Sequence, residues 1–194
     1  MDIKKTANLF INFTIKRIIE IFGIIIFTAG IFLAISLISY APDDPNFVFP
    51  DNTKINNILG FQGAIVSDLF FQSIGLVSYL FSLTLIITGI NILRSKDFFL
   101  VIENIFFTII YSLFGSFFLE YFYSNSFTLY INGNGGFVGS YLEQTFLTSL
   151  VQINEIIFYY VLIILNLTLF LVSINFHPLR FYKTIKKASG LFMS

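Results

Sequence analysis

Residues 21–38 read IFGIIIFTAGIFLAISLI, a run that contains no charged side chain. An α-helix rises about 1.5 Å per residue, so this run nearly crosses a bilayer core of about 30 Å. Ile18 and Ile19 extend it. The apolar core of a signal peptide is shorter, about 7–15 residues, and here Pro42 follows where a cleavage site would be needed. The run therefore predicts a permanent membrane anchor.

The composition agrees with a protein embedded in a lipid bilayer. Hydrophobic residues make up 56% of the 194 positions and charged residues 11%, and the mean hydropathy is +0.85. An ordinary soluble domain carries about 25% charged residues. The chain has no cysteine, which excludes disulfides and cysteine-ligated metal sites. We expect an integral membrane protein.

Three more apolar stretches follow the first, and together they predict an all-α, four-transmembrane-helix bundle over residues 18–176. The expected spans are about 18–39, 70–93, 98–122 and 153–175, with outer loops 40–69 and 123–152 and a turn at 94–97. The mixed polarity of residues 138–151 predicts a short interfacial helix in the second outer loop. Residues 1–17 form an amphipathic N-terminal segment on the membrane surface, and residues 177–194 a basic tail that begins a linker.

An alternative topology omits the third span, because Glu103 and Glu120 flank its middle. Both lie near the ends of that span, however, where a long side chain reaches interfacial water. We therefore keep four spans.

The basic residues predict the orientation. Ten of the eleven lysines and arginines lie in the N-terminal segment, the 94–97 turn and the C-terminal tail, and only Lys54 lies in an outer loop. Cytoplasmic segments carry the excess of basic residues, so both termini are predicted to be cytoplasmic. The tail residues Arg180, Lys183, Lys186 and Lys187 are interleaved with aromatics and could touch nucleic acid, but beside a span they favour anionic lipid.

Ionisable groups in or near spans are candidate functional residues. Glu20, Glu103, Glu120 and Glu155 all fall near the end of a span, whereas an ion pathway needs such groups near the bilayer midplane. We interpret them as interfacial. For Glu155 a functional role stays the strongest alternative, because the sequence does not fix where its span begins.

Other candidate sites are weaker. Asp43 and Asp44 could supply oxygens to Ca²⁺, but two acids between prolines are simpler to explain as turn formers. His177, the only histidine, precedes Pro178 at a membrane edge and is interpreted as interfacial. No Gly-x-x-x-x-Gly-Lys-Ser/Thr phosphate loop occurs in the sequence, and no cofactor is expected.

Small residues in the spans predict close helix packing. They let helix backbones approach in lipid, where no hydrophobic force drives association. The small candidates are Gly30 and Ala34 in the first span, Gly75, Ser78 and Ser82 in the second, and Ser112, Gly115 and Ser116 in the third. Tyr79 in the second span is a further candidate for helix packing.

Four motifs in this order resemble the N-terminal four-helix membrane domain of the FtsK/SpoIIIE DNA translocases, the FtsK branch in particular. They are SYAPDDPNF at 39–47, NILGFQGAIVSDLFF at 57–71, GLVSY at 75–79 and GGFVG at 135–139. The family pattern has alanine where this chain has Ser67. The resemblance covers roughly residues 18–176, and the family's linker and ATP-driven motor have no counterpart in these residues.

The motif residues are expected to shape a re-entry loop, alone or together with a partner surface. Pro42 and Pro45 stiffen the exit from the bilayer, and Gly60 and Gly63 allow a tight backbone path before a helix. The full set of candidate loop residues is Tyr40, Pro42, Asp44, Pro45, Phe47, Asn57, Gly60, Gly63, Ala64, Asp68, Gly135, Gly136 and Gly139.

The resemblance implies a non-enzymatic membrane anchor and assembly domain of a DNA translocase in cell division and chromosome segregation. Expected partners are the lipid bilayer, membrane proteins of the division septum and further copies of the chain, as a hexamer, with DNA reached only through a motor. The expected location is the bacterial inner membrane, enriched at the septum. The rival interpretations are a small transporter or channel subunit, and an unrelated structural membrane protein.

Overall fold

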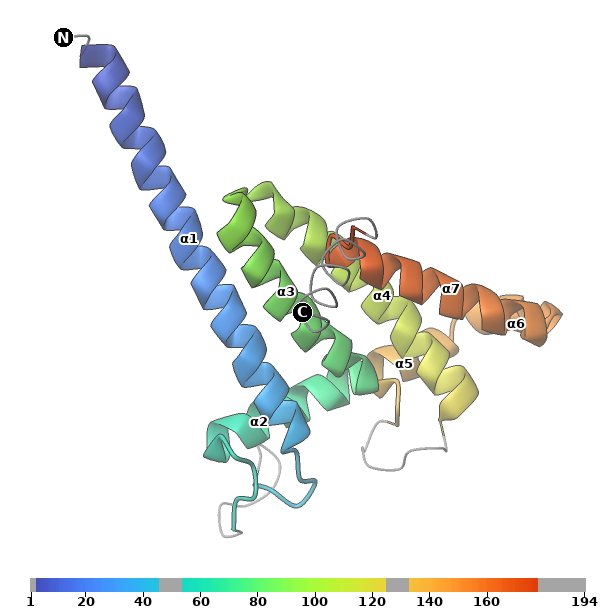
Figure 1. Ribbon diagram of the computed structural model, residues 1–194. Helices are drawn as coiled ribbons and strands as arrows, with labels where there is room; N and C mark the ends of the chain where they lie inside the picture. The colour runs from blue at the N-terminus through green and yellow to red at the C-terminus, as the bar shows by residue number, and fades with distance from the viewer. Residues whose placement is uncertain (1–2, 46–53, 125–132, 178–194) are drawn as a thin grey trace, which may run out of the picture.

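The computed structural model describes residues 3–45, 54–124 and 133–177, and all regular structure within them is helical (Figure 1). The predicted all-α class is confirmed. The elements are α1 (Ile3–Ile38), α2 (Gly60–Ile74), the short 3-10 helix η1 (Gly75–Val77), α3 (Ser78–Ser95), α4 (Phe99–Tyr123), α5 (Gly136–Glu143), α6 (Phe146–Ile153) and α7 (Glu155–Ser173).

Four helical stretches are long and apolar enough to cross a membrane, as the sequence predicts. They are Asn8–Ile38, Gly60–Ser95, Phe99–Tyr123 and Glu155–Ser173. The distribution of side chains fits this environment. Large apolar side chains are exposed along every long helix, whereas most of the buried polar side chains are Ser, Thr or Asn. A soluble fold would reverse this pattern, so these helices have lipid as their solvent.

The second predicted span differs from the observed helices. Residues 70–93 cover the end of α2, the η1 turn and most of α3, because Gly75 has a φ of +61° and ends α2. Figure 1 shows α2 crossing beside the lower ends of α1 and α3 rather than continuing along α3. With 18 residues, α3 alone is about 27 Å long, close to the bilayer core.

The spanning helices form an open row in the order α1, α3, α4, α7. In Figure 1, α1 lies along α3 and α4 lies along α7, while α5 packs on α2 and α4. Among the described residues, α1 makes no extensive contact with α4 or α7.

Glycines bring α1 and α3 into close contact. A Cβ atom on Gly30 would lie 2.7 Å from the Ile86 nitrogen, and one on Gly89 would lie 2.6 Å from the Phe27 Cβ. Backbones this close leave no room for a side chain, which is how small residues promote packing in lipid. The structure thus places Gly30 at a helix contact, together with Gly89, which the sequence interpretation missed.

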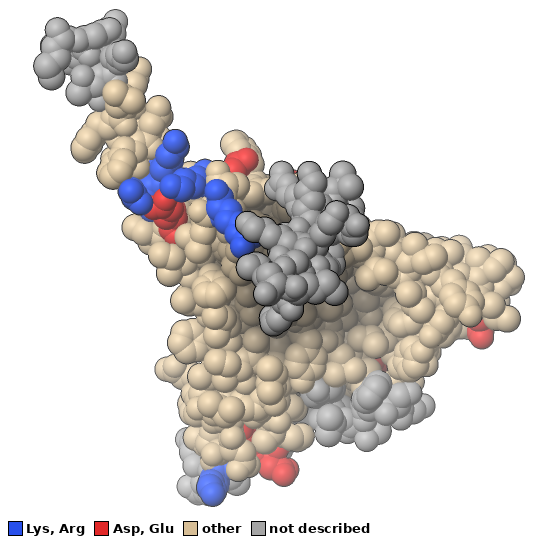
Figure 2. All heavy atoms as spheres, in the orientation of Figure 1, with Lys and Arg blue, Asp and Glu red and all other residues tan. Residues whose placement is uncertain are grey.

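An ion-pair cluster joins α1 and α3 at the end that carries the 94–97 turn. The Glu20 carboxylate lies 2.6 Å from Arg17 Nη1 through one oxygen and 2.6 Å from Lys96 Nζ through the other. Figure 2 shows basic side chains gathering here, above a broad surface with few charges. Residues 3–17 continue α1 without a break, so the predicted N-terminal segment is part of the same helix.

The polar second loop contains two short helices, α5 and α6, where one was expected. Thr145 caps α6 by accepting a hydrogen bond from the Leu147 N–H at 3.4 Å. Their position on the membrane surface stays a prediction.

Candidate functional site

The described residues of the four sequence motifs gather at the end of the molecule opposite the 94–97 turn. We call this region the cap: residues 40–45, 54–77 and 133–143, which include α2, η1 and α5.

Asp44 closes the first loop of the cap. Its side chain is 3% exposed, and its two carboxylate oxygens accept the backbone N–H groups of Asn56 at 2.7 Å and Asn57 at 2.8 Å. Charge-assisted bonds of this kind are stronger than neutral ones. Asp43, next to it, is exposed. Among the described residues no group of three His, Asp or Glu side chains could hold a metal ion, so the calcium interpretation gains no support.

Asn57 ties the loop to α1 and α2. Its amide nitrogen donates to the Ser36 carbonyl at 2.9 Å, and its amide oxygen accepts from the Leu59 N–H at 3.1 Å. A Cβ atom on Gly63 would lie 2.2 Å from that oxygen, so only glycine fits there. The Ser36 hydroxyl in turn donates to the Gly63 carbonyl at 2.5 Å.

Tyr40 and Asp68 link the end of α1 to α2. The Tyr40 hydroxyl donates to Asp68 Oδ1 at 3.3 Å, and Gln72 donates to Asp68 Oδ2 at 2.8 Å. Burial, and then the charge of Asp68, raise the pKa of Tyr40 above its ordinary value, which keeps its hydroxyl a proton donor. The Tyr40 ring packs on Phe71 with a centroid distance of 4.9 Å.

Gly75 is the junction between the two halves of the cap. A Cβ atom there would lie 1.9 Å from the Asn134 carbonyl oxygen, which accepts the Leu76 N–H at 3.0 Å. Gly136, with a φ of +63°, also lies too close for a side chain: its Cβ would lie 2.6 Å from the Gly75 nitrogen. The motifs GLVSY and GGFVG therefore meet in space, and glycine is required on both sides.

The same glycine-rich segment packs on α4. A Cβ atom on Gly135 would lie 2.2 Å from the Ser116 carbonyl oxygen, and one on Gly139 would lie 2.6 Å from it. The Glu120 carboxylate accepts the Gly135 N–H at 3.1 Å. Glu120 thus holds the cap in place, a role that its interpretation as an interfacial carboxylate did not include.

The structure also describes several other residues that the sequence marked as candidates. Pro42 is exposed and Pro45 is buried. Ala64 is buried on α2, and the Tyr79 hydroxyl donates to the Leu37 carbonyl at 3.3 Å. Phe47 and the basic tail beyond His177 lie outside the described residues.

The small residues predicted for helix packing divide into two groups. Gly115 contacts Val77, where an added Cβ would lie 3.0 Å from the side chain, and Ala34 is half-buried on α1. The Ser78 hydroxyl instead donates to the Phe70 and Gly75 carbonyls, at 3.0 and 2.7 Å, and so stabilises the break between α2 and α3.

The sequence interpretation missed Asn134, which is fully buried between two glycines and donates to the Tyr123 carbonyl. Ser116 was predicted as a packing residue, and its hydroxyl also donates to the Ile74 carbonyl at 3.0 Å. An asparagine framed by glycines was the available signal, since that setting is typical of a tight turn.

A seam of uncharged polar side chains joins α3, α4 and the end of α7. The Thr84 and Tyr111 hydroxyls lie 2.9 Å apart, and the Asn104 amide donates to Thr88 at 2.8 Å and accepts from Asn175 at 2.6 Å. In lipid such bonds hold helices together. The seam contains no acid or base that titrates near neutral pH.

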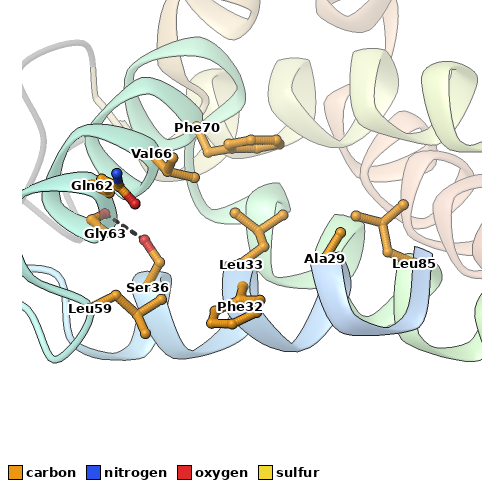
Figure 3. Close-up of a pocket in the computed structure, with 10 residues that line it drawn as sticks. All are labelled: Ala29, Phe32, Leu33, Ser36, Leu59, Gln62, Gly63, Val66, Phe70 and Leu85. Carbon is orange, nitrogen blue, oxygen red and sulfur yellow. Dashed lines mark hydrogen bonds between the residues drawn. The ribbon is translucent and has the colours of Figure 1, made fainter. Parts of the chain in front are cut away.

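An apolar groove of about 510 Å³ lies between α1 and α2. Figure 3 shows Phe32, Leu33, Val66 and Phe70 around it, and the bond from Ser36 to the Gly63 carbonyl at one end. Its lining is mostly hydrocarbon, with Ser36 and Gln62 as the polar side chains, so it suits apolar contacts.

Comparison with known proteins connects this geometry to a family. Residues 15–186 match the family described as the 4TM region of DNA translocase FtsK/SpoIIIE. The chain is similar to the DNA translocase FtsK of Rickettsia prowazekii (strain Madrid E), at 35% identity over 69 residues, and to that of Rickettsia typhi (strain ATCC VR-144 / Wilmington), at 34% over 67 residues. These matches cover 36% and 34% of this chain, and 9% of each relative's length. No solved structure matches. Because the family match covers most of the described helices, the chain belongs to the family of the FtsK/SpoIIIE four-transmembrane region.

Proposed function

We propose that this chain is the membrane anchor and assembly domain of a DNA translocase that acts in cell division and chromosome segregation. The observation that carries the proposal is the cap: its motif residues bond to one another and to helix ends, which builds a fixed surface rather than a reaction centre. The relatives are named DNA translocases, and this chain matches a small part of their length.

The proposed location is the bacterial inner membrane with enrichment at the division septum. The cap faces outward and contacts membrane proteins of the septum, and the chain assembles with copies of itself, as a hexamer. α1 and α7 stand at the two ends of the open row, where their lipid-facing sides are accessible to further copies of the chain. DNA is reached only through a motor attached to such a domain.

A fluorescent fusion tests the localisation. Residues 1–194 fused to a fluorescent protein should collect at midcell in dividing cells, and uniform membrane fluorescence would contradict the proposal. Asp44→Ala should loosen the cap and abolish the midcell band while total membrane fluorescence persists. The matched variant Asp43→Ala changes an exposed carboxylate and should keep the band.

The second candidate, a small transporter or channel subunit, has one supporting observation, the polar seam across α3, α4 and α7. The triple variant Glu103→Gln, Glu120→Gln and Glu155→Gln separates the two. A transporter that uses these carboxylates would lose its flux, whereas the anchor should still localise, because glutamine at 120 keeps an oxygen to accept the Gly135 N–H.

A further inference from the structure

Three aromatic rings form perpendicular walls where α4 ends and α7 begins. The Phe122 and Tyr159 rings have a centroid distance of 5.1 Å and an interplanar angle of 84°, and the Tyr159 and Tyr160 rings 5.4 Å and 88°. They line a cavity of about 260 Å³ together with Glu155 and Ile156. A water molecule occupies about 30 Å³ in the liquid, so the cavity has room for a small polar group.

One wall of this cavity carries a negative charge with an unused oxygen. Glu155 and Tyr159 lie four residues apart on one face of α7, and Glu155 Oε1 accepts the Tyr121 hydroxyl at 3.0 Å. Among the described residues, Oε2 has no hydrogen-bond or ion-pair partner. A carboxylate next to the faces of several aromatic rings is the chemistry that recognises an ammonium group.

Basic residues are scarce in the parts of the sequence that form this end of the molecule. Seven of its eleven acidic residues lie between Asp43 and Asp68 or between Glu120 and Glu155, and Lys54 is the one basic residue in those two stretches. Because Glu155 forms no ion pair among the described residues, its carboxylate can take a cation from outside the chain.

The surroundings of the cavity point to a lipid. The cavity lies at the ends of two spanning helices, the depth at which tyrosines meet lipid headgroups. Ile156 is 74% exposed and Tyr160 60% exposed, so the cavity opens toward the lipid-facing side. Phospholipid headgroups at that depth include ammonium groups.

We propose that Phe122, Tyr159 and Tyr160, with the Glu155 carboxylate, bind the primary ammonium headgroup of a zwitterionic phospholipid, of which phosphatidylethanolamine is the type. The ammonium rests against the ring faces and donates hydrogen bonds to Glu155 Oε2 and the Tyr160 hydroxyl. A quaternary headgroup lacks N–H donors and binds less well, and an anionic headgroup is repelled by Glu155.

Lipid competition in native mass spectrometry tests this site. The purified chain is exchanged into equimolar phosphatidylethanolamine, phosphatidylcholine and phosphatidylglycerol with identical acyl chains, and the retained lipids are counted. The wild-type chain should retain the ethanolamine lipid over the glycerol lipid by roughly threefold to tenfold. Glu155→Gln and Tyr160→Leu should both remove this preference.

Two controls keep the result specific. Glu103→Gln removes an exposed carboxylate near the opposite end of α4, and Tyr141→Leu removes an exposed tyrosine on α5; both should keep the preference. Equal retention of the ethanolamine and glycerol lipids by the wild-type chain would overturn the proposal, and so would an unchanged preference in Glu155→Gln. The aromatic residues would then be an interfacial belt with no headgroup preference.

A soluble competitor distinguishes a lipid from a protein lysine. Glycerophosphoethanolamine carries the lipid's headgroup, and Nα-acetyl-lysine amide carries the ammonium of a lysine side chain. Displacement of the lipid by glycerophosphoethanolamine at the lower concentration supports the assignment. If the lysine amide displaces the lipid at the lower concentration, the site binds a protein partner and the lipid assignment is wrong.

Discussion

Asp43 and Asp44 are adjacent carboxylates in the cap, yet their burial and their contacts differ. Asp44 is buried and accepts two backbone N–H groups, while Asp43 is exposed. A buried donor that loses its acceptor keeps its desolvation penalty, whereas an exposed carboxylate contributes little. The difference between neighbours shows that the cap depends on individual hydrogen bonds.

We therefore expect Asp44→Ala to lower the free energy of unfolding by roughly 1–3 kcal/mol and Asp43→Ala to change it by less than about 0.5 kcal/mol. Denaturant titration in detergent micelles, followed by helical circular dichroism, measures both. Equal effects in the two variants would show that the Asp44 bonds do not stabilise the cap.

The sequence predicted most of the cap's residues but few of their partners. Asn57, Gly63 and Asp68 were found because a motif marks them. Their contacts with Ser36 and Tyr40 join positions 21 to 28 residues apart, and no local period reports such pairs. For the same reason, the pairing of Gly75 with Asn134 emerged only from the folded chain.

At the scale of elements, the predicted and observed folds differ most at Gly75, where the helix breaks between α2 and α3 inside the second predicted span. Apolar runs predicted four spans, because hydropathy and length suffice for that. They gave no sign of the turn between α2 and α3, since both helices are apolar and the break depends on one positive φ. The sequence also did not predict that the spanning helices form an open row, because the helix order depends on where glycines let two helices approach closely.

Gly75→Ala and Gly60→Ala form a matched test of this break. Both glycines have positive φ, +61° and +67°, but an added Cβ meets the Asn134 carbonyl at 1.9 Å in the first case and nothing within 4 Å in the second. Backbone strain adds to the cost of both substitutions, because a side chain disfavours a positive φ. Gly75→Ala should cost at least twice as much as Gly60→Ala in thermal unfolding; similar losses would argue against the contact with Asn134.

The α1–α3 contact permits a similar comparison between Gly30 and Gly23. A Cβ atom at Gly30 meets the Ile86 backbone nitrogen at 2.7 Å, whereas one at Gly23 meets side-chain atoms of Leu93 and Ile92 at 3.0 Å or more. Side chains can move aside, but a packed backbone cannot without separating the helices.

We expect Gly30→Ala to destabilise the protein by about 1–3 kcal/mol through overpacking. Gly23→Ala should be near neutral, because alanine's helix propensity offsets a small clash. Thermal unfolding in the same micelles compares them, and a larger loss for Gly23→Ala would mean that α1 packs on α3 along another face.

At the scale of the whole molecule, the helix bundle has two ends that differ in the charged residues they carry. The Glu20 ion pairs and the 94–97 turn lie at one end, and the cap with the acidic stretches lies at the other. Basic residues mark cytoplasmic segments, so the turn end should face the cytoplasm and the cap the other side. The proposed anchor depends on this sidedness, since a cytoplasmic motor needs one end and septal partners need the other.

Site-directed cysteine labelling in intact cells tests that sidedness most directly, and the absence of native cysteine makes it specific. Asp43→Cys lies in the cap and Ser95→Cys at the turn end, and both positions are exposed. A membrane-impermeant maleimide applied to spheroplasts should label cysteine 43 at once and cysteine 95 only after lysis. Labelling of cysteine 95 in intact spheroplasts, with cysteine 43 protected until lysis, would contradict the account.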